Sequence, residues 1–137
     1  MKLSKHFSLN EMTTTSYDVD NTPTKEDLER LIYFCENFME PVRNKFGPIR
    51  VHSGYRSKTL NAAIPGSAKK SAHCFGCACD FTAYDPAVSV RDIVKWIVNE
   101  SNLPYDQVID ECKGGSPWVH LGMLRPGYQH KPRKQWI

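Results

Sequence analysis

The stretch from Ser71 to Asp80 reads Ser-Ala-His-Cys-Phe-Gly-Cys-Ala-Cys-Asp, and the rest of the chain is best understood outward from it. It holds His73 and Asp80, and a second histidine, His120, follows in the segment Trp-Val-His at 118–120. Imidazole and carboxylate groups are ligands that Zn²⁺ takes, and catalytic zinc sites use three protein ligands and leave a fourth position for water. If the three side chains converge, the sequence predicts a hydrolase. If they do not, it predicts a small soluble domain with scattered histidines.

The segments around this stretch predict an α+β fold, with helices packed on an antiparallel sheet. Period-two patterns bounded by turn residues indicate strands, and apolar residues at three- and four-residue spacing indicate helices. We expect strands at 49–53, 79–84, 107–112 and 118–123, and helices at 24–46, 57–64 and 90–98. These elements lack a regular strand–helix–strand order, which argues against a parallel sheet.

The helix expected at 24–46 carries clear start and stop signals. Thr24 and Asp27 resemble a capping box in which Asp replaces Glu, and acidic residues in a first turn suit the helix dipole. Gly47-Pro48 should end the helix. Pro41 should kink or divide it, because proline lacks the backbone N–H of a helix interior.

The length of 137 residues predicts one domain over 1–137, with an irregular segment at 1–23 and a basic tail at 124–137. Within the first segment, Ser8 and Glu11 predict a short capped turn. The tail gathers lysine and arginine with two aromatic residues, and we interpret it as a solvated segment rather than a polymer-binding patch.

Composition excludes several classes of protein. Hydrophobic residues make up 40% and charged residues 24%, which is typical of a globular domain, and no apolar run approaches the ~18 to 20 residues of a membrane span. A net charge of +3 is too mild to indicate nucleic-acid binding by itself. The first residues lack the apolar core of a secretory signal, so we expect synthesis in the cytoplasm, or exit from it by a route that needs no such signal. We also expect no membrane insertion and a monomeric protein.

Five cysteines in a chain without such a signal are expected to be reduced thiols. Cys74, Cys77 and Cys79 crowd next to His73, but no second Cys-x-x-Cys pair follows, as structural zinc sites usually require. We therefore expect buried small side chains rather than metal ligands.

Strand alternation predicts which residues share a face with His120. Trp118 and Gly122 should lie on its face of the strand, and Ile109 and Glu111 should share one face of the preceding strand. A hairpin can place Glu111 near His120, although spacing alone fits a solvated carboxylate equally well.

Nine short segments carry a resemblance to a known family. They are Phe7-Ser-Leu-Asn-Glu-Met12, Glu40-Pro-Val-Arg43, Ser53-Gly-Tyr-Arg-Ser57, Leu60-Asn61, Gly66-Ser67, Ser71-x-His73, Gly76-x-Ala78-x-Asp80-Phe81, Gln107-Val-Ile-x-Glu111 and Trp118-Val-His120. In order and spacing they resemble the M15 family of zinc D-Ala-D-Ala carboxypeptidases. The most similar branch is the small one, subfamily A, which includes phage and bacterial peptidoglycan peptidases.

The resemblance implies a fold shared with the hedgehog signalling domain and the DD-peptidases. It implies three zinc ligands: His73, Asp80 and His120. It also implies that Arg56 binds the substrate and stabilises the oxyanion, for which its planar fork suits it better than lysine. Ser71 matches a serine that contacts substrate in relatives, and Ser67 either does the same or forms a turn.

The general base departs from the commonest pattern of the family. Many relatives carry glutamate three residues before the last histidine, where this chain has Pro117. The small branch places it on the preceding strand, and Glu111 matches that position, whereas Asp110 should face the other way.

The resemblance therefore implies a zinc peptidase acting on peptidoglycan stem peptides, as a carboxypeptidase or an endolysin-type endopeptidase. Such an enzyme acts on the cell wall, after holin-type release if it is a phage or prophage product. The alternative is a non-enzymatic, zinc-containing, hedgehog-like binding module, which would need neither Arg56 nor Glu111.

Overall fold

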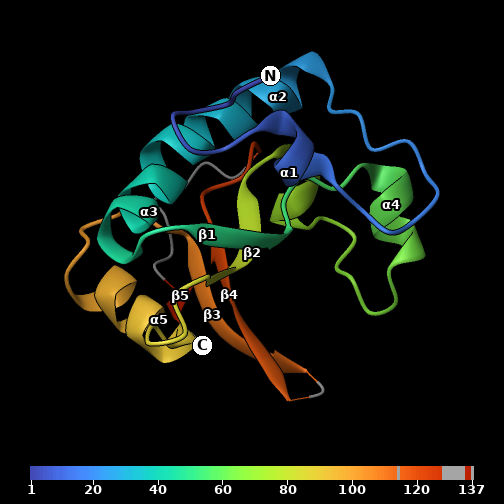
Figure 1. Ribbon diagram of the computed structural model, residues 1–137. Helices are drawn as coiled ribbons and strands as arrows, with labels where there is room; N and C mark the ends of the chain where they lie inside the picture. The colour runs from blue at the N-terminus through green and yellow to red at the C-terminus, as the bar shows by residue number, and fades with distance from the viewer. Residues whose placement is uncertain (114, 128–134, 137) are drawn as a thin grey trace.

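A five-stranded sheet forms the centre of the computed structural model, which describes residues 1–113, 115–127 and 135–136 (Figure 1). The strand order is β1-β2-β4-β3-β5. Every neighbouring pair is antiparallel except β3 and β5, which are parallel. The bounds are β1 Ile49–Ser53, β2 Ala78–Ala83, β3 Gln107–Lys113, β4 Ser116–Gly122 and β5 Gln135–Trp136. The predicted α+β fold with an antiparallel sheet is confirmed.

One face of the sheet is buried against helices, and the other face carries polar side chains, among them Asp80 and His120. The core combines side chains of α2 (Lys25–Phe34), α3 (Glu40–Phe46) and α5 (Val90–Asn99) with Cys79, Phe81, Val108, Val119 and Leu121 of the sheet. Figure 1 shows α2, α3 and α5 on one side of the strands and α4 (Lys58–Ala63) on the other. Strand alternation then sends Asp80 and His120 to the face away from this core.

The helix expected at 24–46 is divided, as predicted from Pro41. A π-helical turn, η1 (Cys35–Met39), separates α2 from α3, and Pro41 lies in the first turn of α3. Proline cannot donate to the carbonyl four residues earlier and its ring crowds that carbonyl, so a wider turn upstream relieves the conflict. Gly47 ends α3 with a φ of 82°.

The capping box predicted at Thr24 forms only in part. The Thr24 side chain accepts a hydrogen bond from the Asp27 backbone N–H, but the Asp27 carboxylate points elsewhere. It accepts from the Tyr55 hydroxyl at 2.9 Å and from Arg30 at 2.5 Å. Asp27 is buried, so these two donors supply the hydrogen bonds that a buried carboxylate requires.

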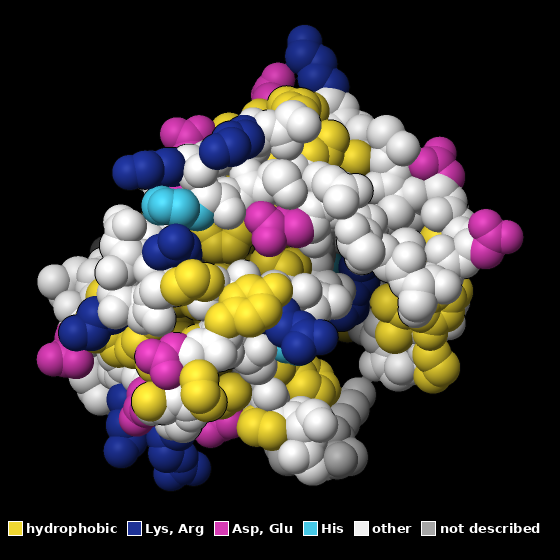
Figure 2. Space-filling view, viewed as in Figure 1, with side chains coloured by type: hydrophobic (Ala, Val, Ile, Leu, Met, Phe, Trp, Pro, Cys, Tyr) yellow, Lys and Arg dark blue, Asp and Glu magenta, His cyan; other side chains and the backbone are white. Residues whose placement is uncertain are grey.

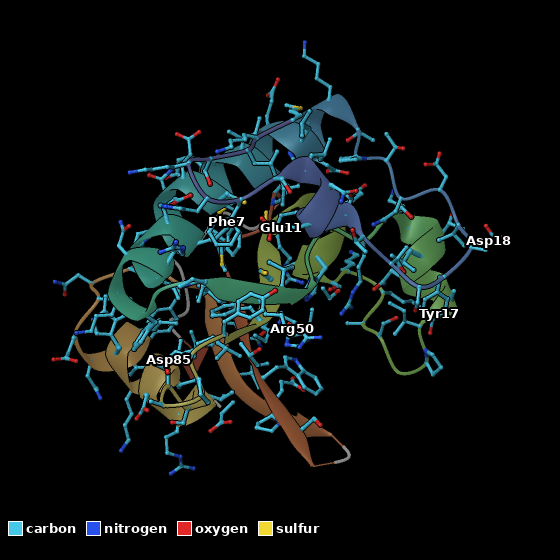
Figure 3. All side chains as sticks on the ribbon, viewed as in Figure 1. Phe7, Glu11, Tyr17, Asp18, Arg50 and Asp85 are labelled. Atoms are coloured by element: carbon cyan, nitrogen blue, oxygen red, sulfur yellow. The ribbon has the colours of Figure 1, made fainter. Side chains whose placement is uncertain are left out.

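The segment 1–23 contains one short helix, α1 (Leu9–Thr13), whose Ser8 and Glu11 form the predicted reciprocal cap. Leu3, Phe7 and Met12 from this segment belong to the core, and Figure 3 shows Phe7 between the long helix and β1. The N-terminal segment is therefore packed structure, which polar composition did not reveal.

The described part of the tail is not simply solvated. Arg125 donates a hydrogen bond to the backbone oxygen of Lys70, and Gln135–Trp136 forms β5 at the edge of the sheet. Residues 128–134 and 137 lie outside the described residues, so the interpretation of this stretch as a basic tail stays a prediction. No helix in the described ranges is long and apolar enough to cross a membrane.

We expect Gly76→Ala to destabilise the fold far more than Gly66→Ala. Both glycines have positive φ, 75° and 77°, so each alanine incurs a backbone cost of about 1 kcal/mol. A Cβ at Gly76 would also lie 2.5 Å from the backbone oxygen of Asp27, whereas one at Gly66 would meet nothing within 4 Å. The collision should add about 1 to 3 kcal/mol to the loss of unfolding free energy, measurable in urea. Equal losses in the two variants would contradict this account.

Candidate metal centre

The three candidate ligands come from one short turn and two adjacent strands. His73 lies on η2 (Ala72–Phe75), a 3-10 turn that begins where the Ser71 side chain accepts from the His73 backbone N–H at 3.3 Å. Asp80 lies on β2 and His120 on β4, and the two residues are direct partners across the strand pair. The sheet register therefore brings together two ligands that are 40 positions apart in the sequence.

The side chains converge on one point. Oδ1 of Asp80 lies 3.3 Å from Nε2 of His73 and 2.9 Å from Nδ1 of His120, and the three ligand atoms lie within 4.8 Å of one another. Tetrahedral ligands about 2.0–2.2 Å from a zinc ion would be separated by roughly 3.3 Å. Within the described ranges, this is the one group of His, Cys, Asp and Glu side chains placed to hold a metal ion.

Neighbouring groups orient each ligand. Nδ1 of His73 donates to the backbone oxygen of Gly54 at 2.7 Å, so Nε2 carries the lone pair that faces Asp80. An Arg56 terminal nitrogen donates to Oδ2 of Asp80 at 3.3 Å, which leaves Oδ1 toward the two imidazoles. Such partners around a ligand set fix tautomers and ring orientation and raise metal affinity.

The protonation states suit metal binding. Burial lowers the pKa of the His73 imidazole, against the opposing effect of Asp80, and favours the neutral form that a ligand requires. Burial alone would raise the pKa of the Asp80 carboxyl, but its interactions with His73 and His120 outweigh it and hold that pKa well below the usual range. The site thus presents neutral imidazole nitrogen and ionised carboxylate.

An irregularity in β1 adds Arg56 to the site. The register between β1 and β2 shifts between Val51 and Ser53, so Ser53 pairs with Asp80. Arg56 donates from Nε to the Ser53 hydroxyl at 3.0 Å while it bonds Asp80. β-bulges re-aim side chains in this way and are common beside active sites.

A cavity of about 400 Å³ opens over the ligands. Figure 2 shows a hollow between the sheet and the part of the molecule that carries α4, with basic side-chain atoms in its wall. The lining includes the three ligands with Arg56, Ser67, Ser71, Asp106, Glu111, Trp118 and Arg125. All residues assigned a role from the sequence therefore border one cavity.

Glu111 lies on the wall of this cavity, as strand alternation predicted. It pairs with Trp118 on β4, and His120 pairs with Ile109, so Glu111 and His120 are diagonal neighbours on one face. Asp110 faces the other side of the sheet, where its carboxylate lies 3.9 Å from Arg91. Glu111 is not a member of the metal-ligand group.

The two serines have structural hydrogen bonds as well as access to the cavity. The Ser67 hydroxyl donates to the backbone oxygens of Asn61 at 2.5 Å and Ile64 at 3.0 Å, which is the turn-forming arrangement. Ser71 caps the turn of His73. Both serines also border the cavity.

Two charged residues of the cavity wall, Asp106 and Arg125, have no role predicted from the sequence. Arg125 falls in the segment expected to be a basic tail, and Asp106, which is buried, matches no motif. Arg125 follows His120 by five positions just beyond the end of β4, and this proximity is the signal that could have identified it.

Four of the cysteines are buried free thiols, as expected: Cys35, Cys74, Cys77 and Cys79. Burial raises the pKa of each, to about 12 for Cys77, which keeps the thiol protonated. The side chain of Cys112 lies outside the described residues. Cys79 points into the core and Asp80 toward the cavity, which is the alternation predicted for this strand.

The other described histidines lie outside the ligand group. His6 forms an ion pair with Glu40 at 2.6 Å near the N-terminus. Nε2 of His52 lies 2.8 Å from the Thr82 hydroxyl on the same face of the sheet as Asp80. Neither belongs to the metal-ligand group, which agrees with their absence from the motifs.

A family model described as Peptidase M15 matches residues 5–108. The chain belongs to the M15 peptidase family. The match spans more than half of this M15 peptidase and includes Arg56, His73 and Asp80, but it ends before Glu111 and His120, which the β3–β4 hairpin brings to the site. A comparison with curated proteins gave no match. Membership of a peptidase family implies hydrolase activity.

Proposed function

We propose that this M15 peptidase is a zinc enzyme that hydrolyses peptide bonds in the stem peptides of bacterial peptidoglycan. One observation carries the proposal: His73, Asp80 and His120 converge in a cavity that Arg56 and Glu111 also border. A purely structural zinc site would be closed by four protein ligands and would need no carboxylate or guanidinium beside it.

The donor set fits zinc. Two imidazole nitrogens and one carboxylate oxygen are the composition of a catalytic site with an open position. When bound, Zn²⁺ supplies Lewis-acid polarisation of a carbonyl and lowers the pKa of a water molecule toward ~7. His73, Asp80 and His120 would hold it.

Glu111 is the proposed general base. It accepts a proton from the attacking water and passes it to the amine that leaves when the peptide bond breaks. It lies on the same face as His120, two residue pairs further along the hairpin, and it borders the cavity into which the substrate must enter.

Arg56 is proposed to bind the scissile carbonyl and stabilise the oxyanion that forms on it. A guanidinium has five N–H donors, and the bonds to Ser53 and Asp80 use two of them. The same bonds hold the side chain in place before substrate arrives, which is the condition for effective electrostatic stabilisation. Ser71 is proposed to contact the substrate backbone.

Purified protein tests this proposal directly. We expect about one zinc per chain by elemental analysis, as a single three-ligand site requires. We also expect release of peptides or D-amino acids from peptidoglycan, identified by mass spectrometry, and loss of this activity after chelation. Zinc binding without hydrolysis of any wall fragment would refute the enzyme and support a binding module.

A further inference from the structure

A second cavity, of about 300 Å³, adjoins the metal centre and has no role in the chemistry above. Its lining consists of His52, Asp80, Ser116, Pro117 and Trp118. Asp80 and Trp118 also border the first cavity. The two hollows therefore meet at a metal-ligand residue.

Both cavities lie on the same face of the sheet. Thr82 shares a face of β2 with Asp80, and His52 contacts its hydroxyl from β1. Ser116, Trp118 and His120 share a face of β4 by the same alternation. Along β4 the second cavity thus extends from the metal centre toward the tip of the hairpin.

The two cavities differ in chemistry. The first is lined by Arg56, Arg125 and Glu111, whereas the second is lined by Trp118 and Pro117, which carry no charge. Among the described residues of the second lining, and apart from the shared Asp80, His52 is the one titratable group. Burial and the neighbouring Arg50 (labelled in Figure 3) lower the pKa of that imidazole and favour its neutral form. The second cavity thus suits an uncharged group with apolar surface.

We propose that the second cavity is a substrate subsite, which binds a peptide residue with a small apolar side chain beyond the scissile bond. This inference rests on the proposed function. A peptide whose scissile bond lies at the candidate metal centre can pass Asp80 and continue into the second cavity along the same face of the sheet. The enzyme then acts best on extended stem peptides, and a dipeptide leaves this subsite empty.

A ladder of stem-peptide fragments, from dipeptide to pentapeptide around the bond cut in whole peptidoglycan, tests the subsite. We expect kcat/KM to rise by about tenfold or more once the peptide is long enough to reach it, as burial of one apolar side chain can provide. A flat ladder in the wild type would overturn the proposal.

Ser116→Trp supplies the matched variant. Ser116 is exposed at the start of β4, and an indole there should fill the cavity without disturbing the core. In this variant we expect kcat/KM no longer to rise with peptide length, while zinc content and dipeptide hydrolysis stay at wild-type values. Lys95→Trp, exposed on α5, is the control and should keep the full gain.

The outcomes separate the two proposals. A Ser116→Trp ladder equal to that of the wild type would overturn the subsite and leave the peptidase intact, as would equal losses in Ser116→Trp and Lys95→Trp. If Ser116→Trp loses zinc or dipeptide hydrolysis, Ser116→Gln replaces it, with a reduced gain expected. No hydrolysis of whole peptidoglycan or any fragment by the wild type would refute the proposed function itself.

Discussion

Replacing Glu111 with glutamine should lower kcat by about 10²- to 10⁴-fold, which is the usual contribution of a general base. The carboxamide keeps the size and shape of the carboxylate but cannot accept a proton from water. Glu111 is outside the metal-ligand group, so zinc content should not change. Steady-state kinetics on a defined stem peptide, together with elemental analysis of the same preparation, check both parts.

Asp110→Asn is the matched control for this variant. Asp110 is the neighbour of Glu111 on β3, but its carboxylate faces Arg91 on the opposite side of the sheet from the cavity. The same chemical change there should leave kcat within about twofold, because an exposed ion pair contributes at most about 1 kcal/mol to stability and touches no reacting atom. Full turnover in Glu111→Gln would remove Glu111 from the mechanism and require another base.

The largest loss is expected when a ligand is removed. In His120→Ala only His73 and Asp80 remain of the ligand group. Two ligands are too few, because structural zinc sites use four protein ligands and catalytic sites use three. Loss of a partner outside the ligand set already costs about 10- to 100-fold in metal affinity, so the loss of a ligand should exceed about 100-fold. Activity should fall below detection at equimolar zinc. Competition with a chelator of known affinity measures the first effect.

Two other histidines provide controls for the ligand variant. His52→Ala and His6→Ala change the same residue type, and neither histidine belongs to the ligand group. Both variants should bind zinc with wild-type affinity. If His120→Ala keeps that affinity, or if His52→Ala loses it, the assignment of the third ligand is wrong.

Local patterns were sufficient for most elements of the fold. Helix caps were predicted correctly at Ser8 and Thr24, and the break in the long helix was predicted correctly from Pro41. Caps and proline act through the nearest turn of backbone, so a local pattern is enough to find them. Alternation in β3 and β4 correctly predicted which side chains leave the core. The failures were at longer range. The sequence near Asp27 indicated a reciprocal cap, but Tyr55, 28 positions away, provides its partner instead.

The sequence by itself determined the chemistry of the site: two imidazoles, one carboxylate, an arginine and a glutamate, in an order that resembles one peptidase family. Only the tertiary structure decided that these groups meet. Asp80 and His120 become neighbours through the register of β2 and β4, and the bulge in β1 brings Ser53 and Arg56 beside them. The second cavity and the position of Arg125 also arise from contacts between distant segments. Side-chain type is a property of each position, whereas convergence depends on strand register and packing, and no local pattern in the chain encodes these.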